Sequence, residues 1–375
     1  MKIVTVIGAR PQFVKAAAVS RAIAEHNATY ADHRALITEV IVHTGQHFDA
    51  NMSDIFFEEM QIPRPNYHLE INSVGHGAMT GRMLEKIEDV LIKEKPDYVL
   101  VYGDTNSTLA GALAAKKLHI KVVHVEAGLR SFNMRMPEEI NRILTDRISN
   151  ILCCPTENAV ENLINEGFKH FPCTFANTGD VMLDAALFYS TFSAEKSDII
   201  NRLGLEPKAF FLCTIHRAEN TDDEERIRSI FVALNEISTR HPVVLPLHPR
   251  TQKIASSLNL LTDPANSKLV IVPPVGYFDM IELLKHTKAV ITDSGGLQKE
   301  AYFFGKPCIT LRDETEWVEL LANGANMLTG ASSTKIIDAC NQLSDKFSNT
   351  DSQLYGSGYA SKNIIKLISQ NYALG

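Results

Sequence analysis

The sequence has no surplus of basic residues: 37 Lys and Arg stand against 44 Asp and Glu, which gives a net charge of -7. That balance argues against a protein whose main partner is nucleic acid, because little positive charge is available to neutralise phosphates. It also has no run of about 18 apolar residues, so we expect no membrane-spanning helix. The apolar run at residues 2–8 is too short for a secretory signal peptide and reads instead as a strand.

Cysteine is scarce, and its spacing matches neither a disulfide framework nor a zinc site. The chain has six cysteines, none of them in a CxxC pair, and most lie in apolar runs. We therefore expect buried free thiols in a cytoplasmic protein and no metal centre. A GxGxxG loop is absent as well, so the fingerprint of a dinucleotide-binding fold is missing.

What the sequence does contain is a series of β-branched apolar runs, each followed by a helical stretch. The runs are continuously apolar, which is typical of parallel strands buried on both faces. The pattern predicts two Rossmann-like, doubly wound α/β domains facing a cleft, 1–178 and 179–357, because it pauses near residues 178–182 and then restarts. An amphipathic helix at about 358–375 is expected to pack back on the first domain. Further helices are expected near Pro11 and at residues 51–60, 107–118, 137–148 and 157–167.

Polar residues follow the expected strands of the first domain, at the edge where open α/β sheets bind ligands. Gly8 permits a tight turn, and Arg10 and Lys15 at the start of the next helix would suit an anion. The alternative is a plain turn with a surface arginine. Asp104 also ends a strand, and its alternative role is to cap the helix that follows.

A dense charged cluster follows the strand at residues 121–125. Glu126 is poorly explained as a cap, because Gly and Leu separate it from the next helix. Glu138 and Glu139 fall in the first turn of a helix, where acidic residues ordinarily complement the helix dipole. A core does not require such a cluster. Its members are Glu126, Arg130, Arg135, Glu138, Glu139 and Arg142.

The second domain repeats this arrangement of polar residues after strands. His216 and Arg217 follow one expected strand, and His248 and Arg250 follow another. A lone histidine is usually structural, but these lie at equivalent topological positions, which favours a functional role.

The segment from Asp293 to Glu300 is the strongest local signal. Ser294 can cap a helix, and Gly295 and Gly296 allow a ligand to approach the backbone at its positive N-terminus. This combination predicts a phosphate cradle. Glu300, one turn further on, could accept hydrogen bonds from ribose hydroxyls. The alternative is a glycine-softened turn without a ligand.

Together these segments resemble the non-hydrolysing UDP-N-acetylglucosamine 2-epimerase family, in order from residue 8 to residue 316. The resemblance implies a glycosyltransferase-B type fold, a homodimer, no metal or nicotinamide cofactor, and a role in surface polysaccharide biosynthesis. The matching motifs are "GARPQFVK", "HTGQHFD", "VYGDTNST", "HVEAGLR", "RMPEEINR", "NTGD", "IHRAEN", "LHP", "TDSGGLQKEA" and "GKPCITLRDETE".

The resemblance also implies roles for individual residues. The carboxylates around C2 and the leaving group are Asp104, Glu126 and Glu138. His216 faces the diphosphate and the glycosidic oxygen. The substrate- and UDP-binding positions are Arg10, Lys15, Arg217, His248 and Phe278, with Ser294, Gly295 and Gly296 for the diphosphate and Glu300 for the ribose.

The chemistry of such a reaction gives the charged cluster a purpose. The hydrogen at C2 of a UDP-sugar is hardly acidic until the C1–O bond to UDP breaks and the sugar becomes oxocarbenium-like. A carboxylate can then remove it to leave a 2-acetamidoglucal and UDP, and reprotonation from the opposite face inverts C2. Cations and a helix N-terminus stabilise the departing diphosphate. The cluster thus supplies carboxylates for proton transfer, with arginines balancing their charge.

The chain departs from many bacterial members at Gln12, Phe48, Asp49, Ala218 and Trp317. These variants resemble a branch that acts on UDP-2,3-diacetamido-2,3-dideoxy-glucuronate, and some are shared with archaeal UDP-N-acetylglucosamine epimerases. The expected reaction is therefore UDP-GlcNAc to UDP-ManNAc, with the diacetamido-glucuronate as the alternative substrate. A glycosyltransferase of the same fold, a hydrolysing epimerase and a non-catalytic UDP-sugar sensor remain further alternatives.

Overall fold

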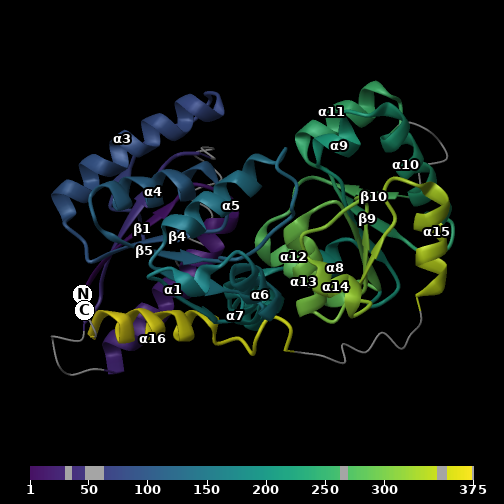
Figure 1. Ribbon diagram of the computed structural model, residues 1–375. Coiled ribbons are helices and arrows are strands. Elements are labelled where there is room, and N and C mark those ends of the chain that lie inside the picture. The colour runs from purple at the N-terminus through teal and green to yellow at the C-terminus, as the bar shows by residue number, and fades with distance from the viewer. Residues whose placement is uncertain (30–35, 47–62, 262–268, 344–352, 374–375) are drawn as a thin grey trace. The chain divides into compact units, whose positions relative to one another are not determined.

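A computed structural model describes residues 1–29, 36–46, 63–261, 269–343 and 353–373 (Figure 1). Its contacts divide the chain into two compact units. The first comprises Met1–Ala185 with Ser352–Gly375, and the second comprises Ala186–Asp351. The predicted helix at residues 51–60 lies outside the described residues, as do Phe48 and Asp49.

The first unit is built on a parallel sheet of seven strands in the order β3-β2-β1-β4-β5-β6-β7. The order reverses between β1 and β4, which pair with Ile3 opposite Tyr98. Loops that leave the carboxyl ends of strands at such a reversal frame the ligand crevice of an open α/β sheet. The strands are β1 (Lys2–Ile7), β2 (Thr38–His43), β3 (Tyr67–His68), β4 (Tyr98–Tyr102), β5 (Lys121–Val125), β6 (Ile151–Cys154) and β7 (Thr174–Asn177).

Helices cover both faces of this sheet (Figure 1). α3, α4 and α5 lie on one face, where Met83, Ile87 and Leu91 pack against β-branched strand residues such as Val99 and Val101. α1 and α16 pack together on the other face. The bounds are α1 (Arg10–Thr29), α3 (His76–Glu94), α4 (Asn106–Lys117), α5 (Pro137–Ile148), α6 (Glu157–Asn165), the 3-10 helix η2 (Phe168–His170), α7 (Val181–Lys196) and α16 (Ala360–Ala373).

The C-terminal helix α16 is anchored at its start by a buried carboxylate. Asp184 accepts hydrogen bonds from the backbone N–H groups of Ala360 and Ser361, at 3.0 and 2.8 Å, and from the Ser361 hydroxyl at 2.6 Å. Ile364 and Ile368 are fully buried on one face of the helix. α16 thus belongs to the first unit although the second unit precedes it in sequence.

The second unit repeats the architecture with six parallel strands in the order β10-β9-β8-β11-β12-β13. α10 and α15 pack on one face of the sheet, and α8, α12 and α13 on the other. The order reverses between β8 and β11. The strands are β8 (Phe211–Thr214), β9 (Val243–Pro246), β10 (Leu269–Val272), β11 (Ala289–Thr292), β12 (Cys308–Thr310) and β13 (Asn326–Leu328). The helices are α8 (Ile199–Arg202), α9 (Ala218–Thr221), α10 (Glu224–Ser238), α11 (Pro249–Ser257), α12 (Tyr277–His286), α13 (Gly295–Phe303), α14 (Val318–Ala322) and α15 (Ser333–Gln342).

The prediction of two parallel α/β sheets is therefore confirmed. All six cysteines are free thiols, and only Cys173 is not fully buried. Within the described ranges, no helix has the length and apolarity needed to cross a membrane. The same ranges contain no group of three or more His, Cys, Asp or Glu residues placed to hold a metal ion.

Candidate active site

Two carboxylates emerge at the carboxyl ends of the neighbouring strands β4 and β5. Asp104 follows Gly103, which turns the chain at φ +63°, and Glu126 itself adopts φ +72°. A positive φ is uncommon for a glutamate, and such backbone strain gathers at functional sites. Lys15, from α1, forms an ion pair with Glu126, and both side chains are 9% exposed. A Cβ atom on Gly103 would lie 3.3 Å from the Glu126 carboxylate, so the turn allows this pair to approach the backbone closely.

Asp104 is not the cap of the helix that follows it. Thr105 caps α4, where its side chain accepts the N–H of Thr108. The Asp104 carboxylate instead accepts a 2.6 Å bond from Arg142 of α5, and its side chain is 31% exposed. Desolvation raises the pKa of Asp104, Arg142 opposes the rise, and the nearby Glu126 adds to it. A carboxyl group with a raised pKa holds its proton more readily than an ordinary carboxyl group does, which suits a proton donor.

The adjacent glutamates of α5 have different environments. Glu138 is exposed in the first turn. Glu139 is 1% exposed and accepts bonds from the backbone N–H groups of Ser131 and Phe132, both at 2.9 Å, and from Arg142 at 2.8 Å. Burial alone would raise the pKa of Glu139, but these donors together lower it. Glu139 is therefore a fixed anion that holds the preceding loop and Arg142, whereas Glu138 is open to solvent.

Gln12 joins the two strand ends at the reversal of the sheet. Its side-chain oxygen accepts the N–H groups of Gly8 and Ala9, at 2.8 and 3.0 Å. Its amide nitrogen donates to the carbonyl oxygen of Tyr102 at 2.8 Å and to the Thr105 hydroxyl at 3.0 Å. An amide both accepts and donates, whereas an ionised glutamate only accepts. A glutamine at position 12 therefore satisfies donors and acceptors together, which an ionised glutamate would not.

A buried network holds the turns on which the carboxylates stand. Asp146 of α5 is fully buried and accepts bonds from His124 at 2.6 Å, Gly128 N–H at 3.1 Å and Arg130 at 2.7 Å. Arg130 also forms two parallel bonds to Glu166, at 2.7 and 2.8 Å. Burial favours the neutral form of Asp146, but His124 and Arg130 outweigh it and lower its pKa. His124 and Asp146 were not among the predicted site residues, because a buried polar network leaves no periodic signal in the sequence.

In the second unit, His216 is positioned by another fully buried carboxylate. Asp293, at the end of β11, lies 3.1 Å from Nδ1 of His216 and accepts the backbone N–H groups of His216 and Arg217 at 3.0 to 3.1 Å. Asn220 donates to it at 3.2 Å. Burial opposes ionisation, but these contacts, His216 foremost, lower the pKa of Asp293. The imidazole itself is 45% exposed and hence open to a ligand.

The N-terminus of α13 lies where the sequence predicts a phosphate cradle. Ser294 caps it by accepting the N–H of Leu297. A Cβ atom on Gly295 would lie 2.4 Å from the Glu316 carboxylate, whereas one on Gly296 would meet nothing within 4 Å. Packing therefore accounts for the glycine at 295, while at 296 the absent side chain leaves open space in front of helix N–H groups. Such groups and the helix dipole favour a bound phosphate.

Three further predicted residues of the second unit, on α13, α11 and α12, differ in how far they are exposed. Glu300 is half-buried, one turn into α13. His248 is exposed and accepts the N–H of Arg250 as the cap of α11. Phe278 is 8% exposed and packs edge-on to Tyr189, with ring centroids 5.9 Å apart, which is a core contact.

Arg217 is half-buried and precedes α9, which begins at the exposed Ala218. Arg10 begins α1, but its side chain is outside the described part of the structure. Trp317, another departure from bacterial relatives, is buried under the ammonium group of Lys299, 4.2 Å from the ring centroid.

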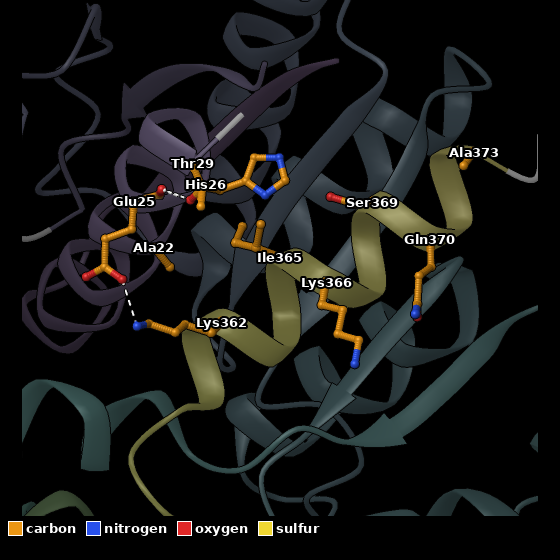
Figure 2. A pocket seen from close by; sticks show the side chains of 10 residues that line it. All are labelled: Ala22, Glu25, His26, Thr29, Lys362, Ile365, Lys366, Ser369, Gln370 and Ala373. Carbon is orange, nitrogen blue, oxygen red and sulfur yellow. Dashed lines mark hydrogen bonds and ion pairs between the residues drawn. The ribbon is translucent and has the colours of Figure 1, made fainter. Parts of the chain in front are cut away.

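A surface groove lies between α1 and α16 (Figure 2). It is lined by the last turns of α1, at the amino ends of the strands, whereas the carboxylates stand at the carboxyl ends. The ion pair across it, Lys362 to Glu25 at 2.8 Å, joins side chains that are more than half exposed. Exposed pairs of this kind contribute little to stability. We therefore place no catalytic role in this groove.

Comparison with known proteins decides the family. The family model described as UDP-N-acetylglucosamine 2-epimerase matches residues 30–369. The chain belongs to this family. A UDP-2,3-diacetamido-2,3-dideoxy-D-glucuronate 2-epimerase from Pseudomonas aeruginosa is 55% identical over 371 residues, 99% of this chain and 100% of the relative. A UDP-N-acetylglucosamine 2-epimerase from Methanocaldococcus jannaschii is 42% identical over 376 residues, 98% of this chain and 99% of the relative.

The fold of this epimerase matches that of known epimerases. The crystal structure of the Methanocaldococcus jannaschii enzyme in complex with UDP-GlcNAc and UDP superposes with a TM-score of 0.87 and 41% identity, covering 99% of this chain and 100% of that one. The resemblance indicated by the motifs is thus confirmed, as are the fold class and the epimerase class of the activity.

Proposed function

We propose that this epimerase inverts C2 of UDP-2,3-diacetamido-2,3-dideoxy-D-glucuronate. The observation that carries the choice of substrate is the identity of 55% over nearly the whole chain with an enzyme named for that reaction. Identity with the archaeal enzyme named for UDP-N-acetylglucosamine is 42%. UDP-N-acetylglucosamine, the first expectation from the sequence, is therefore the second candidate substrate.

The proposed reaction is an elimination followed by an addition. The C1–O bond breaks, its electron pair leaves with UDP, and a carboxylate takes the C2 proton so that a C1=C2 double bond forms. The sugar is then a 2-acetamidoglucal. A proton is delivered to C2 on the opposite face, and the UDP oxygen rebinds C1. Both faces of C2 need an acid or base, which two carboxylates on neighbouring strand ends can provide.

The surroundings of the two carboxylates suggest their division of labour. The ammonium group of Lys15 stabilises the charged form of Glu126, which suits a base. The raised pKa of Asp104 makes it the better proton donor. Enzymes commonly separate acid and base roles by giving two carboxyl groups unlike environments. We assign proton removal from this substrate to Glu126 and reprotonation to Asp104, with the exposed Glu138 as the further carboxylate beside them.

The second unit supplies the groups for the leaving diphosphate. The N–H groups at the start of α13, the open space at Gly296 and the half-exposed His216 suit an anion that gains charge as the C1–O bond breaks. Asp293 keeps the imidazole oriented through its contact with Nδ1. Arg217 and His248 are proposed UDP-binding neighbours, and Glu300 a partner for the ribose hydroxyls.

Proton NMR in D2O tests the reaction and the substrate together. The purified protein is incubated separately with the diacetamido-glucuronate and with UDP-N-acetylglucosamine, and Glu126→Gln serves as the inactive control. We expect a C2 epimer with deuterium at C2 from the diacetamido-glucuronate. Turnover of UDP-N-acetylglucosamine alone would reverse the order of the substrates. Release of free UDP and free sugar would indicate a hydrolysing enzyme, and binding without exchange a sensor.

The family resemblance also leads us to propose a cytoplasmic homodimer. Multi-angle light scattering of the purified protein measures its mass directly. A mass near twice that of the 41.6 kDa chain supports the dimer, and the mass of a single chain contradicts it.

A further inference from the structure

A short loop next to the carboxylates exposes side chains that the fold does not use. We call residues 131–136 the recognition loop; they connect the turn at Glu126 to α5. Phe132 is 77% exposed and Met134 is 60% exposed. Arg135 is exposed as well. Large apolar side chains exposed on the same loop as an arginine contribute little to a core, and such surface is typical of binding sites.

The backbone of this loop is fixed although its side chains are not packed. Besides the two bonds from Ser131 and Phe132 to Glu139, the Asn133 side chain accepts the N–H of Arg135 at 3.1 Å. The N–H of Met136 donates to the carbonyl oxygen of Asn133 at 3.0 Å. Phe132 adopts φ +58°, an uncommon conformation for a bulky residue. A loop held in this way presents its side chains without having to be ordered by the ligand.

The loop is tied to the catalytic carboxylates by a continuous chain of contacts. Glu139 binds the loop on one side and Arg142 on the other, and Arg142 binds Asp104 at 2.6 Å. The recognition loop is therefore next to the place where the sugar must lie if Asp104 acts at C2. This step rests on the proposed function.

The cations of the recognition loop and of the elements beside it differ in whether they already form ion pairs. Lys15 pairs with Glu126, and Arg142 pairs with both Asp104 and Glu139. Within the described ranges, the Arg135 side chain makes no ion pair. A glucuronate differs from N-acetylglucosamine by a carboxylate at C6, and an unengaged guanidinium binds a carboxylate through two parallel bonds.

We propose that Arg135 binds the C6 carboxylate of the uronate and is the residue that selects it over an uncharged hexose. Phe132 and Met134, on the same loop, are apolar side chains open to the rest of the ligand. Arg135 acts on specificity and takes no part in the proton transfers at C2.

The test compares kcat/KM for the diacetamido-glucuronate and for UDP-N-acetylglucosamine in Arg135→Gln and Arg135→Lys. We expect Arg135→Gln to lose about 10- to 100-fold on the uronate, the usual worth of a charge-assisted pair, and to change little on the uncharged sugar. If the uncharged sugar is not turned over, its inhibition constant serves instead. Arg135→Lys keeps the positive charge but not the planar guanidinium, so its kcat/KM for the uronate should lie between those of wild type and Arg135→Gln. Arg240→Gln is the matched control, since Arg240 is 51% exposed and lies in the second unit, just after α10 ends.

The possible results separate the role of Arg135 from the identity of the substrate. An equal loss on both substrates would make Arg135 a general positioning residue and overturn its role in selection, as would unchanged kinetics. A wild-type protein that turns over only UDP-N-acetylglucosamine would overturn the proposed substrate and this inference together. If wild type turns over the uronate and Arg135→Gln has the same kcat/KM for it, the inference alone is overturned. Circular dichroism confirms that each variant is folded.

Discussion

Nε2 of His124 lies 2.8 Å from the carbonyl oxygen of Gly103, the residue directly before Asp104. The other ring nitrogen faces the carboxylate of Asp146 at 2.6 Å. The imidazole ring thus links the turn at Gly103 to helix α5. Asp146 also accepts the N–H of Gly128, two residues after Glu126. The buried carboxylate of Asp146, together with His124, thus connects the turns that carry Asp104 and Glu126.

Removing the charge of Asp146 should therefore damage stability and activity together. Asp146→Ala removes one of the two ion-pair partners of the buried Arg130 and the acceptor of His124, and we expect a loss of about 3–5 kcal/mol in the free energy of unfolding. Urea denaturation measures it. Glu161→Gln, an exposed carboxylate on α6, is the control and should change stability by less than about 0.5 kcal/mol. A similarly small change in the free energy of unfolding for Asp146→Ala would show that this network does not stabilise the fold.

The lowered pKa of Asp293 predicts how stability depends on pH. A carboxyl group whose pKa is lower in the folded state stabilises the protein above its unfolded pKa, and this contribution disappears as the pH falls through the folded pKa. Wild type should hence lose stability from about pH 4 downward, and Asp293→Asn should lose less over the same range. Denaturation curves at about pH 7, 5, 4 and 3 give the two slopes. If the stability of wild type and that of Asp293→Asn fall equally with pH, the pKa of Asp293 is not lowered by its surroundings.

Replacing single groups of the candidate site should stop turnover while the fold stays intact. We expect Asp104→Asn, Glu126→Gln and His216→Ala each to reduce kcat by about 100-fold or more, the usual contribution of an acid, base or charge-stabilising group. Incorporation of deuterium at C2 is the readout, and thermal unfolding checks the fold. Glu85→Gln on the exposed side of α3 is the control. Wild-type rates in all three variants would remove these residues from the mechanism.

The two neighbouring glycines of α13 should respond differently to alanine. Gly295→Ala forces its Cβ against Glu316 and should lower the melting temperature. Gly296→Ala meets no atom within 4 Å and should keep or slightly raise stability, because alanine favours a helix by up to about 1 kcal/mol. It should nevertheless weaken UDP binding, since the methyl group fills the space proposed for the diphosphate. Calorimetry with UDP tests this, and unchanged affinity in Gly296→Ala would place the diphosphate elsewhere.

Much of the site could be predicted because parallel sheets bring residues far apart in sequence to one edge. Asp104, Glu126, His216 and Ser294 all follow strands, and strand ends are marked by the change from apolar to polar residues. The helix α3 was not predicted, although Met83, Ile87 and Leu91 recur at helical spacing, because its start carries no side-chain cap.

Roles that depend on direction could not be read from the sequence. The sequence alone does not distinguish Glu138 from Glu139 as a candidate. Adjacent helical residues point about 100° apart, however, so one side chain is buried and the other exposed. The sole hint is Arg142, three residues after Glu139 and hence on the same face of the helix. Asp146 lies in the middle of a helix, and its contact with His124 arises only once β5 and α5 pack.

The anchoring of α16 on α1 and Asp184 also affects the order in which the protein can be completed during synthesis. A ribosome releases the strands of the first sheet and then those of the second before it releases residues 360–373. The unit that contains the chain's first strand is therefore the last to acquire all its helices. Until then, the surface of α1 that packs against α16, where Ile364 and Ile368 are buried, stays exposed. Chaperones bind exposed apolar surface of this kind.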